Sequence, residues 1–243
     1  MIATSQMRNE QGERLDTAFH GGNRQGVMVV LGHGLTGNKD RPLLVAVAEG
    51  LAEKGWPCLR VSFSGNGESE GRFEESTISK ETGDLLSVLK MVPQEKRIAY
   101  VGHSMGAAVG VTKASRGLAI QSLVSLAGMV HTADFLKKEF GDVTPDEGNM
   151  WDEEGCPLST AFMEDLQEIG SLVDRAAEVR PPWLLIHGTA DDVVPIQDSL
   201  DAFDSARCEK KLICIPDAGH VFGEESYPVI VDAIDGWLTK CFG

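Results

Sequence analysis

Short apolar runs alternate with amphipathic stretches along most of this 243-residue chain. Continuous apolar runs are typical of strands buried on both faces, and six are expected, at residues 27–31, 58–63, 98–101, 120–126, 183–186 and 211–215. Apolar residues spaced three and four apart predict helices, which are expected at residues 42–54, 79–91, 197–206 and 228–240 and from about residue 105. This alternation predicts an α/β fold, in which helices cover both faces of a mostly parallel sheet.

Two segments depart from this alternation. Near the N-terminus, a turn at residues 9–12 and the alternating Leu15, Thr17 and Phe19 predict an antiparallel hairpin. Residues 129–172 mix apolar residues with Gly, Pro and acidic clusters, and only their tail, from residue 162 to 179, looks helical. We therefore expect one domain over residues 1–243, with a lid insertion at about 129–172 that covers the sheet.

Composition and charge exclude several classes of protein. The chain is 42% hydrophobic and 24% charged, as in globular proteins that are neither disordered nor embedded in a membrane. Its net charge of -15 would repel nucleic acid and anionic membrane surfaces. The first ten residues lack the apolar core of a signal peptide, and no apolar run is long enough to cross a bilayer. The sequence thus predicts no nucleic-acid partner and no membrane insertion, and it does not indicate the oligomeric state.

The five cysteines show no C-x-x-C pair and no histidine at metal-binding spacing. They are expected to be free thiols in a reducing, cytoplasmic environment, with Cys58 and Cys214 as small core residues. A cluster of acidic residues in the insertion lacks the spacing of a calcium loop. The sequence therefore predicts neither a metal site nor a cofactor.

The pattern Gly-His-Ser-Met-Gly at residues 102–106 carries the first chemical signal. It lies between a predicted strand and a predicted helix, which is the context that a G-x-S-x-G nucleophile turn requires. Side chains at the first and last positions of so sharp a turn are expected to collide, so both positions need glycine. Ser104, at the tip of the turn, is the candidate nucleophile, although the pattern alone is not specific.

Two further loops supply partners for a serine nucleophile. Loops collect at the carboxyl ends of parallel strands, and one such loop carries Asp191 and Asp192 while another carries His220. A serine hydroxyl needs a base to take its proton, and the base needs a carboxylate to hold its tautomer. We therefore expect His220 to be the base and Asp191 or Asp192 to be the acid.

Backbone amides are expected to stabilise the oxyanion that forms on attack. The glycine-rich turn that contains His33 and Gly34 lets the Leu35 amide approach a substrate oxygen, and the Met105 amide is the second expected donor. His103 and His187 are expected to hold loops by hydrogen bonds. His33 either supports the oxyanion turn or has no role in it, and the sequence favours neither alternative.

The motifs His33-Gly34, Gly102-x-Ser104-x-Gly106, His187-Gly-x-x-Asp191 and Gly219-His220 together resemble those of the α/β-hydrolases. The resemblance extends from residue 27 to the final helix and implies the α/β-hydrolase fold, with the acid at Asp191 rather than Asp192. Within the family the chain is most similar to small intracellular carboxylesterases, including cinnamoyl/feruloyl esterase-like, monoacylglycerol-lipase-like and serine-aminopeptidase-like members. One loop departs from the family pattern, because Ser62 and Asn66 replace an Asp and a His; these positions are expected to support the loop.

The insertion is expected to set substrate choice. Candidate substrate contacts are Phe135, Met150, Trp151, Phe162, Val193 and Val221, although the aromatic and methionine side chains of the insertion also suit simple packing of the lid onto the sheet. We therefore predict a serine hydrolase of small to medium, partly apolar carboxylic esters. A thioesterase, or a peptidase or amidase with a site for a charged terminus, is the alternative enzyme. A catalytically silent scaffold used for binding is the alternative of another class.

Overall fold

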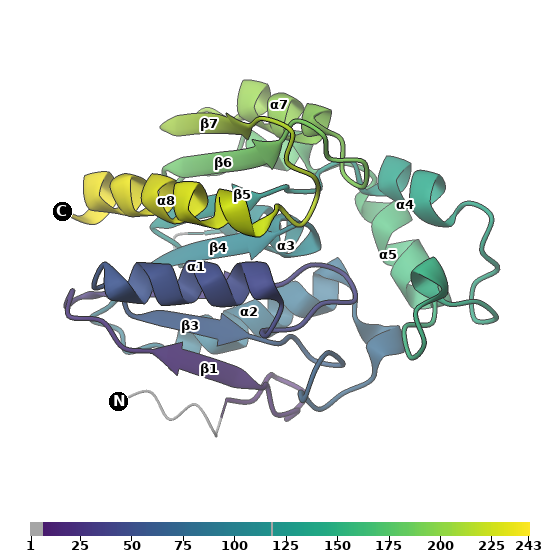
Figure 1. Ribbon diagram of the computed structural model, residues 1–243. Helices are drawn as coiled ribbons and strands as arrows, with labels where there is room; N and C mark the ends of the chain where they lie inside the picture. Colours follow the sequence, from purple (N-terminus) through teal and green to yellow (C-terminus); the bar gives the residue numbers. More distant parts are fainter. Residues whose placement is uncertain (1–6, 118) are drawn as a thin grey trace.

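The computed structural model of the protein describes residues 7–117 and 119–243 (Figure 1). Seven strands of this part form one sheet in the order β1-β3-β2-β4-β5-β6-β7. β1 runs antiparallel to β3, and every other neighbouring pair is parallel. The strands are β1 (Thr17–His20), β2 (Val27–Gly32), β3 (Cys58–Val61), β4 (Arg97–His103), β5 (Ser122–Leu126), β6 (Trp183–Gly188) and β7 (Lys210–Ile215).

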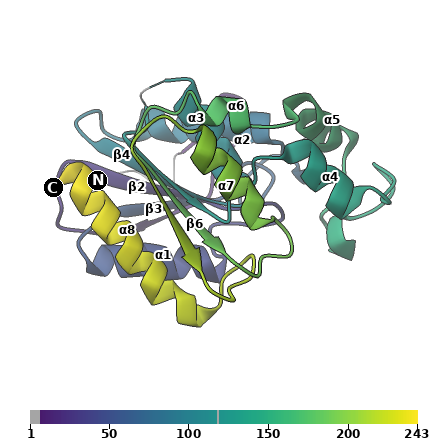
Figure 2. The ribbon, with the colours of Figure 1, turned by 90° about the horizontal axis from the view of Figure 1, so that it is seen from above.

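Helices cover both faces of the sheet, as Figure 2 shows from above. α1 and α8 pack together on one face, and α2, α3, α6 and α7 lie on the other. The helices within the described residues are α1 (Pro42–Glu53), α2 (Ile78–Met91), α3 (Met105–Ser115), α4 (Thr132–Phe140), α5 (Thr160–Ile169), α6 (Val173–Ala176), α7 (Ile196–Ser205) and α8 (Tyr227–Phe242). The predicted α/β fold, mostly parallel with helices on both faces, is confirmed.

The two faces of the sheet bury separate hydrophobic clusters. In β2, for example, Val27, Val29 and Leu31 pack with α1 and α8, whereas Met28 and Val30 pack into the cluster of the opposite face. Successive side chains of a strand point to opposite faces, so a strand covered on both sides must be apolar at every position. This requirement explains the continuous apolar runs of the sequence.

The edge strand β7 corrects one expectation. Cys58 is fully buried in β3, but Cys214 is exposed and is not the core residue that its apolar neighbours suggested. β7 is the last strand of the sheet and is only partly covered, so its residues do not need to be apolar on both faces.

The N-terminal segment turns as predicted. The amide of Gly12 donates to the carbonyl of Asn9, and Arg8 and Arg14 form an antiparallel bridge. The first arm of the predicted hairpin falls partly on residues 1–6, which lie outside the described residues. β1 then forms its strand pairing with β3.

The segment predicted as an insertion lies beyond the carboxyl ends of the parallel strands (Figure 1). It contains α4, the short 3-10 helix η3 (Met150–Asp152) and α5. Ser159 directly precedes α5, and its hydroxyl caps the helix by accepting from the amide of Phe162 and also donates to the carbonyl of Glu74. No helix of the described residues combines the length and the apolar content that crossing a membrane requires.

Candidate active site

Ser104 occupies the sharp turn between β4 and α3. Its backbone has φ 54° and ψ -117°, a conformation that is strained for a residue with a side chain. The Ser104 amide donates to the carbonyl of Leu126 at 2.9 Å, so the turn is tied to the neighbouring strand β5. Strained backbone of this kind persists only where surrounding contacts hold it, and it concentrates at functional sites.

Both glycines of the turn are required, but for reasons that differ from the expected collision of their side chains. A Cβ on Gly102 would overlap the carbonyl oxygen of Gly106 at the start of α3. A Cβ on Gly106 would overlap the carbonyl oxygen of His33 and would lie 2.8 Å from that of Gly32. Gly106 therefore lets α3 approach the end of β2, which brings Ser104 next to the turn that follows β2.

The structure brings Ser104, His220 and Asp191 together from three loops. His220 Nε2 lies 3.0 Å from Ser104 Oγ, and His220 Nδ1 lies 2.8 Å from Asp191 Oδ2. A carboxylate only accepts, so Nδ1 carries the ring proton and Nε2 is free to accept from the serine hydroxyl. This is the arrangement in which an imidazole can take a proton from a serine.

The side chain of Asp191 is fully buried, whereas Asp192 is exposed. The second oxygen of Asp191, Oδ1, accepts from the amides of Val193 and Val194 at 3.0 and 2.9 Å. Burial raises the pKa of Asp191, but the hydrogen bonds from His187 and His220 lower it more, and the pKa falls well below its usual range. The carboxylate next to His220 is therefore ionised, and it is the one that the family pattern indicated.

The turn after β2 is held by His33, which is fully buried. Its Nε2 accepts from the amide of Phe63 at 3.0 Å, so its Nδ1 carries the proton and donates to the carbonyl of Gly34 at 2.8 Å. Burial lowers the pKa of His33 to about 4, which keeps the ring neutral. The amides of Leu35 and Met105 donate none of the turn and loop hydrogen bonds that the structure describes.

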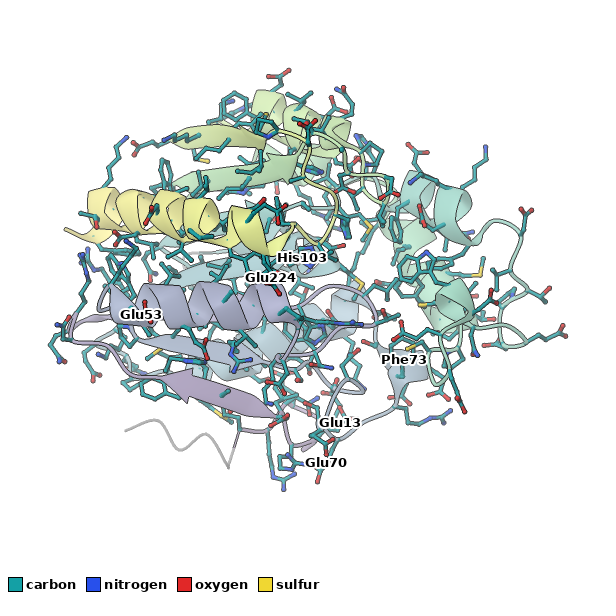
Figure 3. The ribbon with its side chains drawn as sticks, viewed as in Figure 1. Glu13, Glu53, Glu70, Phe73, His103 and Glu224 are labelled. Carbon is teal, nitrogen blue, oxygen red and sulfur yellow. The ribbon has the colours of Figure 1, made fainter. Side chains whose placement is uncertain are left out.

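His103 and His187 also hold loops, as their hydrogen bonds show. His103 Nε2 donates to the carbonyl of His220 at 3.0 Å, and burial, together with the His220 ring, lowers the pKa of His103 to about 3. His187 Nε2 donates to the carbonyl of Val194 at 3.0 Å and lies 3.2 Å from Asp191. Figure 3 labels His103 on the side of the molecule that faces the insertion, whereas Glu53, at the end of α1, lies on the opposite side.

A cavity of about 450 Å³ opens above Ser104, a volume typical of sites for small ligands. Three of the predicted substrate contacts line it, namely Trp151, Val193 and Val221. Phe135, Met150 and Phe162 do not line it; all three are buried in the hydrophobic cluster under the insertion. Phe135 contacts the ring of Trp151, with centroids 6.4 Å apart, so it supports a cavity residue.

Sequence reasoning missed one side of the cavity. Arg41, Pro42, Leu43 and Leu44, at the start of α1, line it together with Tyr227 at the start of α8. Pro42 at the first position of a helix indicated where α1 begins. Only the folded sheet shows that the starts of α1 and α8 meet beside Ser104.

The described residues contain no cluster of three or more His, Cys, Asp or Glu side chains with the geometry of a metal site. The polar groups around Ser104 instead bond one another through directed hydrogen bonds, which suits proton transfer between side chains. The acidic residues of the insertion include Asp146, which accepts from Thr160 at the start of α5.

Comparison with protein families gives one clear match. The sequence profile described as "Alpha/beta hydrolase family" matches residues 29–233 of this chain. Among curated relatives, the human mitochondrial palmitoyl-protein thioesterase ABHD10 is 28% identical over 173 residues, which are 66% of this chain and 55% of the relative. The chain therefore spans just over half the length of that relative. An uncharacterized protein of Mycobacterium tuberculosis is 30% identical over 226 residues, with 91% of this chain and 73% of the relative covered.

Solved structures share the fold along nearly the whole chain. Est1E from Butyrivibrio proteoclasticus, solved with ferulic acid bound, superposes with a TM-score of 0.84 at 24% identity and covers 95% of this chain and 96% of its own. Mouse ABHD10 superposes with a TM-score of 0.79 at 22% identity, over 94% of this chain and 95% of its own.

Proposed function

Because this chain belongs to the alpha/beta hydrolase family, we propose that it is a serine hydrolase that cleaves carboxylic esters through an acyl-enzyme intermediate. The observation that carries the proposal is the unbroken hydrogen-bonded series from Ser104 Oγ through His220 to the buried Asp191. This series faces a mostly apolar cavity, which suits an ester of small to medium size.

In the first half of the proposed reaction, Ser104 Oγ attacks the carbonyl carbon of the ester. Its proton passes to His220 Nε2, and the Asp191 carboxylate stabilises the imidazolium that forms. The amides of Leu35 and Met105 stabilise the negative charge that develops on the carbonyl oxygen by donating hydrogen bonds to it. The bond to the alcohol then breaks, and the departing oxygen takes the proton back from His220.

In the second half, water attacks the acyl-enzyme. His220 takes one proton from that water, and the new oxygen–carbon bond gives a second tetrahedral intermediate. When the bond to Ser104 Oγ breaks, the proton returns to the serine and the carboxylic acid leaves. No proton, electron or cofactor has to be supplied from outside.

A thioester is a second candidate substrate. The observation that favours it is the similarity to proteins named palmitoyl-protein thioesterases. The same steps apply, with a thiol as the leaving group. The cytoplasmic location predicted from the sequence stays a prediction, since these relatives are named mitochondrial.

Labelling with a fluorophosphonate probe tests the proposal. We expect one adduct, located by peptide mass spectrometry on Ser104, and no adduct in a Ser104→Ala variant. p-Nitrophenyl butyrate and its thioester counterpart then separate the two candidate substrates by their kcat/KM values. Folded protein that neither reacts with the probe nor cleaves either substrate would indicate a non-catalytic scaffold.

A further inference from the structure

The cavity above Ser104 carries one formal positive charge and no negative charge. Among the described residues that line it, Arg41 is the one Lys or Arg, and none is Asp or Glu. The histidines His33 and His103 add no charge at neutral pH, because burial lowers their pKa values to about 4 and about 3. Arg41 is thus the one Lys or Arg of this lining that can meet an anionic group of a substrate.

Arg41 lines the cavity and lies directly before Pro42, the first residue of α1. One nitrogen of its guanidinium, Nη2, donates to the carbonyl of Thr36 at 2.7 Å and lies 3.8 Å from Glu153 Oε1. Nε and Nη1 bond no residue in the part of the chain that the structure describes. Three of the five N–H donors of the guanidinium are therefore unused.

The neighbouring cations differ from Arg41, because each has a carboxylate close by. Lys39 lies 3.2 Å from Asp16, and Arg60 lies 3.0 Å from Asp40. Arg41 has only the longer contact with Glu153, and its side chain is 49% exposed. Of these three cations, Arg41 is thus the one that can accept a new anionic partner without breaking a short ion pair.

We propose that Arg41 binds a carboxylate carried by the substrate, at a distance from the bond that is cleaved. The inference rests on the proposed esterase function and narrows its substrate class to anionic esters. A carboxylate can accept a charge-assisted hydrogen bond from the free Nη1 of the guanidinium. The existing neighbour of Arg41, the side chain of Glu153, is itself a carboxylate, so a group of this kind already lies beside the guanidinium.

The rest of the lining suits the remainder of such a substrate. Leu35, Leu43, Leu44 and Val221 give the cavity apolar side chains. Tyr227 also lines the cavity, and its hydroxyl donates to no side chain or carbonyl of the described residues, so it is available as a further donor. An ester with an apolar body and a carboxylate at one end fits this distribution.

Two pairs of matched esters test the proposal and show which end of the substrate meets Arg41. Mono-p-nitrophenyl succinate and p-nitrophenyl butyrate differ by a carboxylate on the acyl group, and 4-acetoxybenzoate and phenyl acetate differ by one on the leaving group. In Arg41→Gln we expect kcat/KM for one of the anionic esters to fall about tenfold, the size of a partly exposed charge-assisted hydrogen bond. The neutral esters should change less than about twofold.

Three further variants serve as controls. Arg41→Lys keeps the charge and should retain part of the preference for the anionic ester. Glu153→Gln removes the competing carboxylate and should raise kcat/KM for that ester. Arg72→Gln makes the same change in net charge at a side chain that is 70% exposed and does not line the cavity. It should leave kcat/KM unchanged for all four esters.

The outcomes separate this inference from the proposed function. If Arg41→Gln lowers the rates for neutral and anionic esters equally, or lowers neither, the proposal that Arg41 binds a substrate carboxylate is wrong. The proposed esterase function is not affected by that outcome. Failure of the wild-type protein to cleave any of the four esters would instead overturn the proposed function itself. Thermal unfolding of each variant checks that the fold is intact.

Discussion

The floor of the cavity and its cover are held in place by different means. The floor consists of residues 102–106 with Asp191 and His220, and backbone contacts fix it: the carbonyl of Gly32 restrains Gly106, and the amides of Val193 and Val194 hold Asp191. The cover is Trp151, which is 43% exposed. Its ring is held by side chains, lying 4.8 Å from the ring of Phe140 and donating to Glu139 at 2.9 Å.

This difference matches the tasks that we propose for the two regions. Proton transfer needs partners within hydrogen-bond reach, so the floor must be fixed to within fractions of an ångström. A cover that contacts the apolar part of a substrate gains free energy from buried area, which does not depend on direction. Changes in the floor should therefore cost far more than changes in the cover.

Replacing the buried carboxylate should give the largest effect on activity. In Asp191→Asn, the amide oxygen can still accept from Val193 and Val194, which leaves the amide nitrogen facing His220 Nδ1. His220 must then accept at Nδ1 and carry its proton on Nε2, where it can no longer take the proton of Ser104. We expect kcat for p-nitrophenyl butyrate to fall about 10³- to 10⁴-fold.

The adjacent residue provides the matched control. Asp192 is exposed and its carboxylate is not bonded to His220, so Asp192→Asn should keep kcat within about threefold of wild type. If Asp192→Asn lost activity and Asp191→Asn kept it, the assignment of the acid would be wrong.

Adding one methyl group to the turn should give the largest effect on stability. In Gly106→Ala, the new Cβ would overlap the carbonyl oxygens of Gly32 and His33, which are backbone atoms that cannot rotate away. We expect the free energy of unfolding, measured with urea, to fall by about 3 kcal/mol.

Gly83→Ala, within α2, provides the control. The new Cβ meets no atom within 4 Å, so the free energy of unfolding should rise by about 0.5–1 kcal/mol through the higher helix propensity of alanine. Equal losses in the two variants would contradict the packing argument.

Most of the floor could be predicted from the sequence. Strands buried on both faces give continuous apolar runs, and the residues that follow them, such as Ser104, Asp191 and His220, must then meet at one edge of the sheet. The reason for Gly106 could not be predicted, because it depends on how closely α3 approaches β2. The exposure of Cys214 was missed because an apolar run does not show whether a strand lies at the edge.

The cover and the far wall of the cavity were harder to predict. Phe135 and Phe162 are apolar residues of the insertion, as is Trp151, and the sequence does not show which of them faces the cavity. Arg41 and Tyr227 are 186 positions apart in the chain, and they meet only because α1 and α8 pack on the same face of the sheet. Their place in the cavity depends on tertiary packing, and no local pattern indicates it.

Acid should destabilise the folded protein through His33. Its pKa is about 4 in the folded protein and about 6.5 when unfolded, so the unfolded state binds a proton first as the pH falls. The stabilisation is complete above pH 6.5 and is lost between pH 6.5 and 4, by on the order of 3 kcal/mol. Burial likewise lowers the pKa of His103 to about 3, so its protonation in acid also reduces the free energy of unfolding.

The contribution of His33 can be isolated by comparing wild type with His33→Gln. Gln can still accept from the amide of Phe63, but it does not titrate. We therefore expect the free energy of unfolding of the variant to fall less steeply between pH 6.5 and 4. If the free energy of unfolding fell equally steeply with pH in both proteins, His33 would not be the group responsible for the loss of stability in acid.

Removing the cover should give the smallest effect. Trp151→Ala deletes a half-exposed ring, so we expect a loss of about 1 kcal/mol in the free energy of unfolding. Because the ring lines the cavity and its N–H bonds Glu139 rather than a reacting group, KM should rise about threefold for p-nitrophenyl esters with longer acyl chains, while kcat stays unchanged. Phe19→Ala, in β1, removes another aromatic ring of similar exposure, 47%, outside the cavity, and should leave KM unaltered. A fall in kcat for p-nitrophenyl acetate as large as that of Asp191→Asn would place Trp151 in the floor, because only a residue that positions the reacting groups has that effect on the smallest substrate.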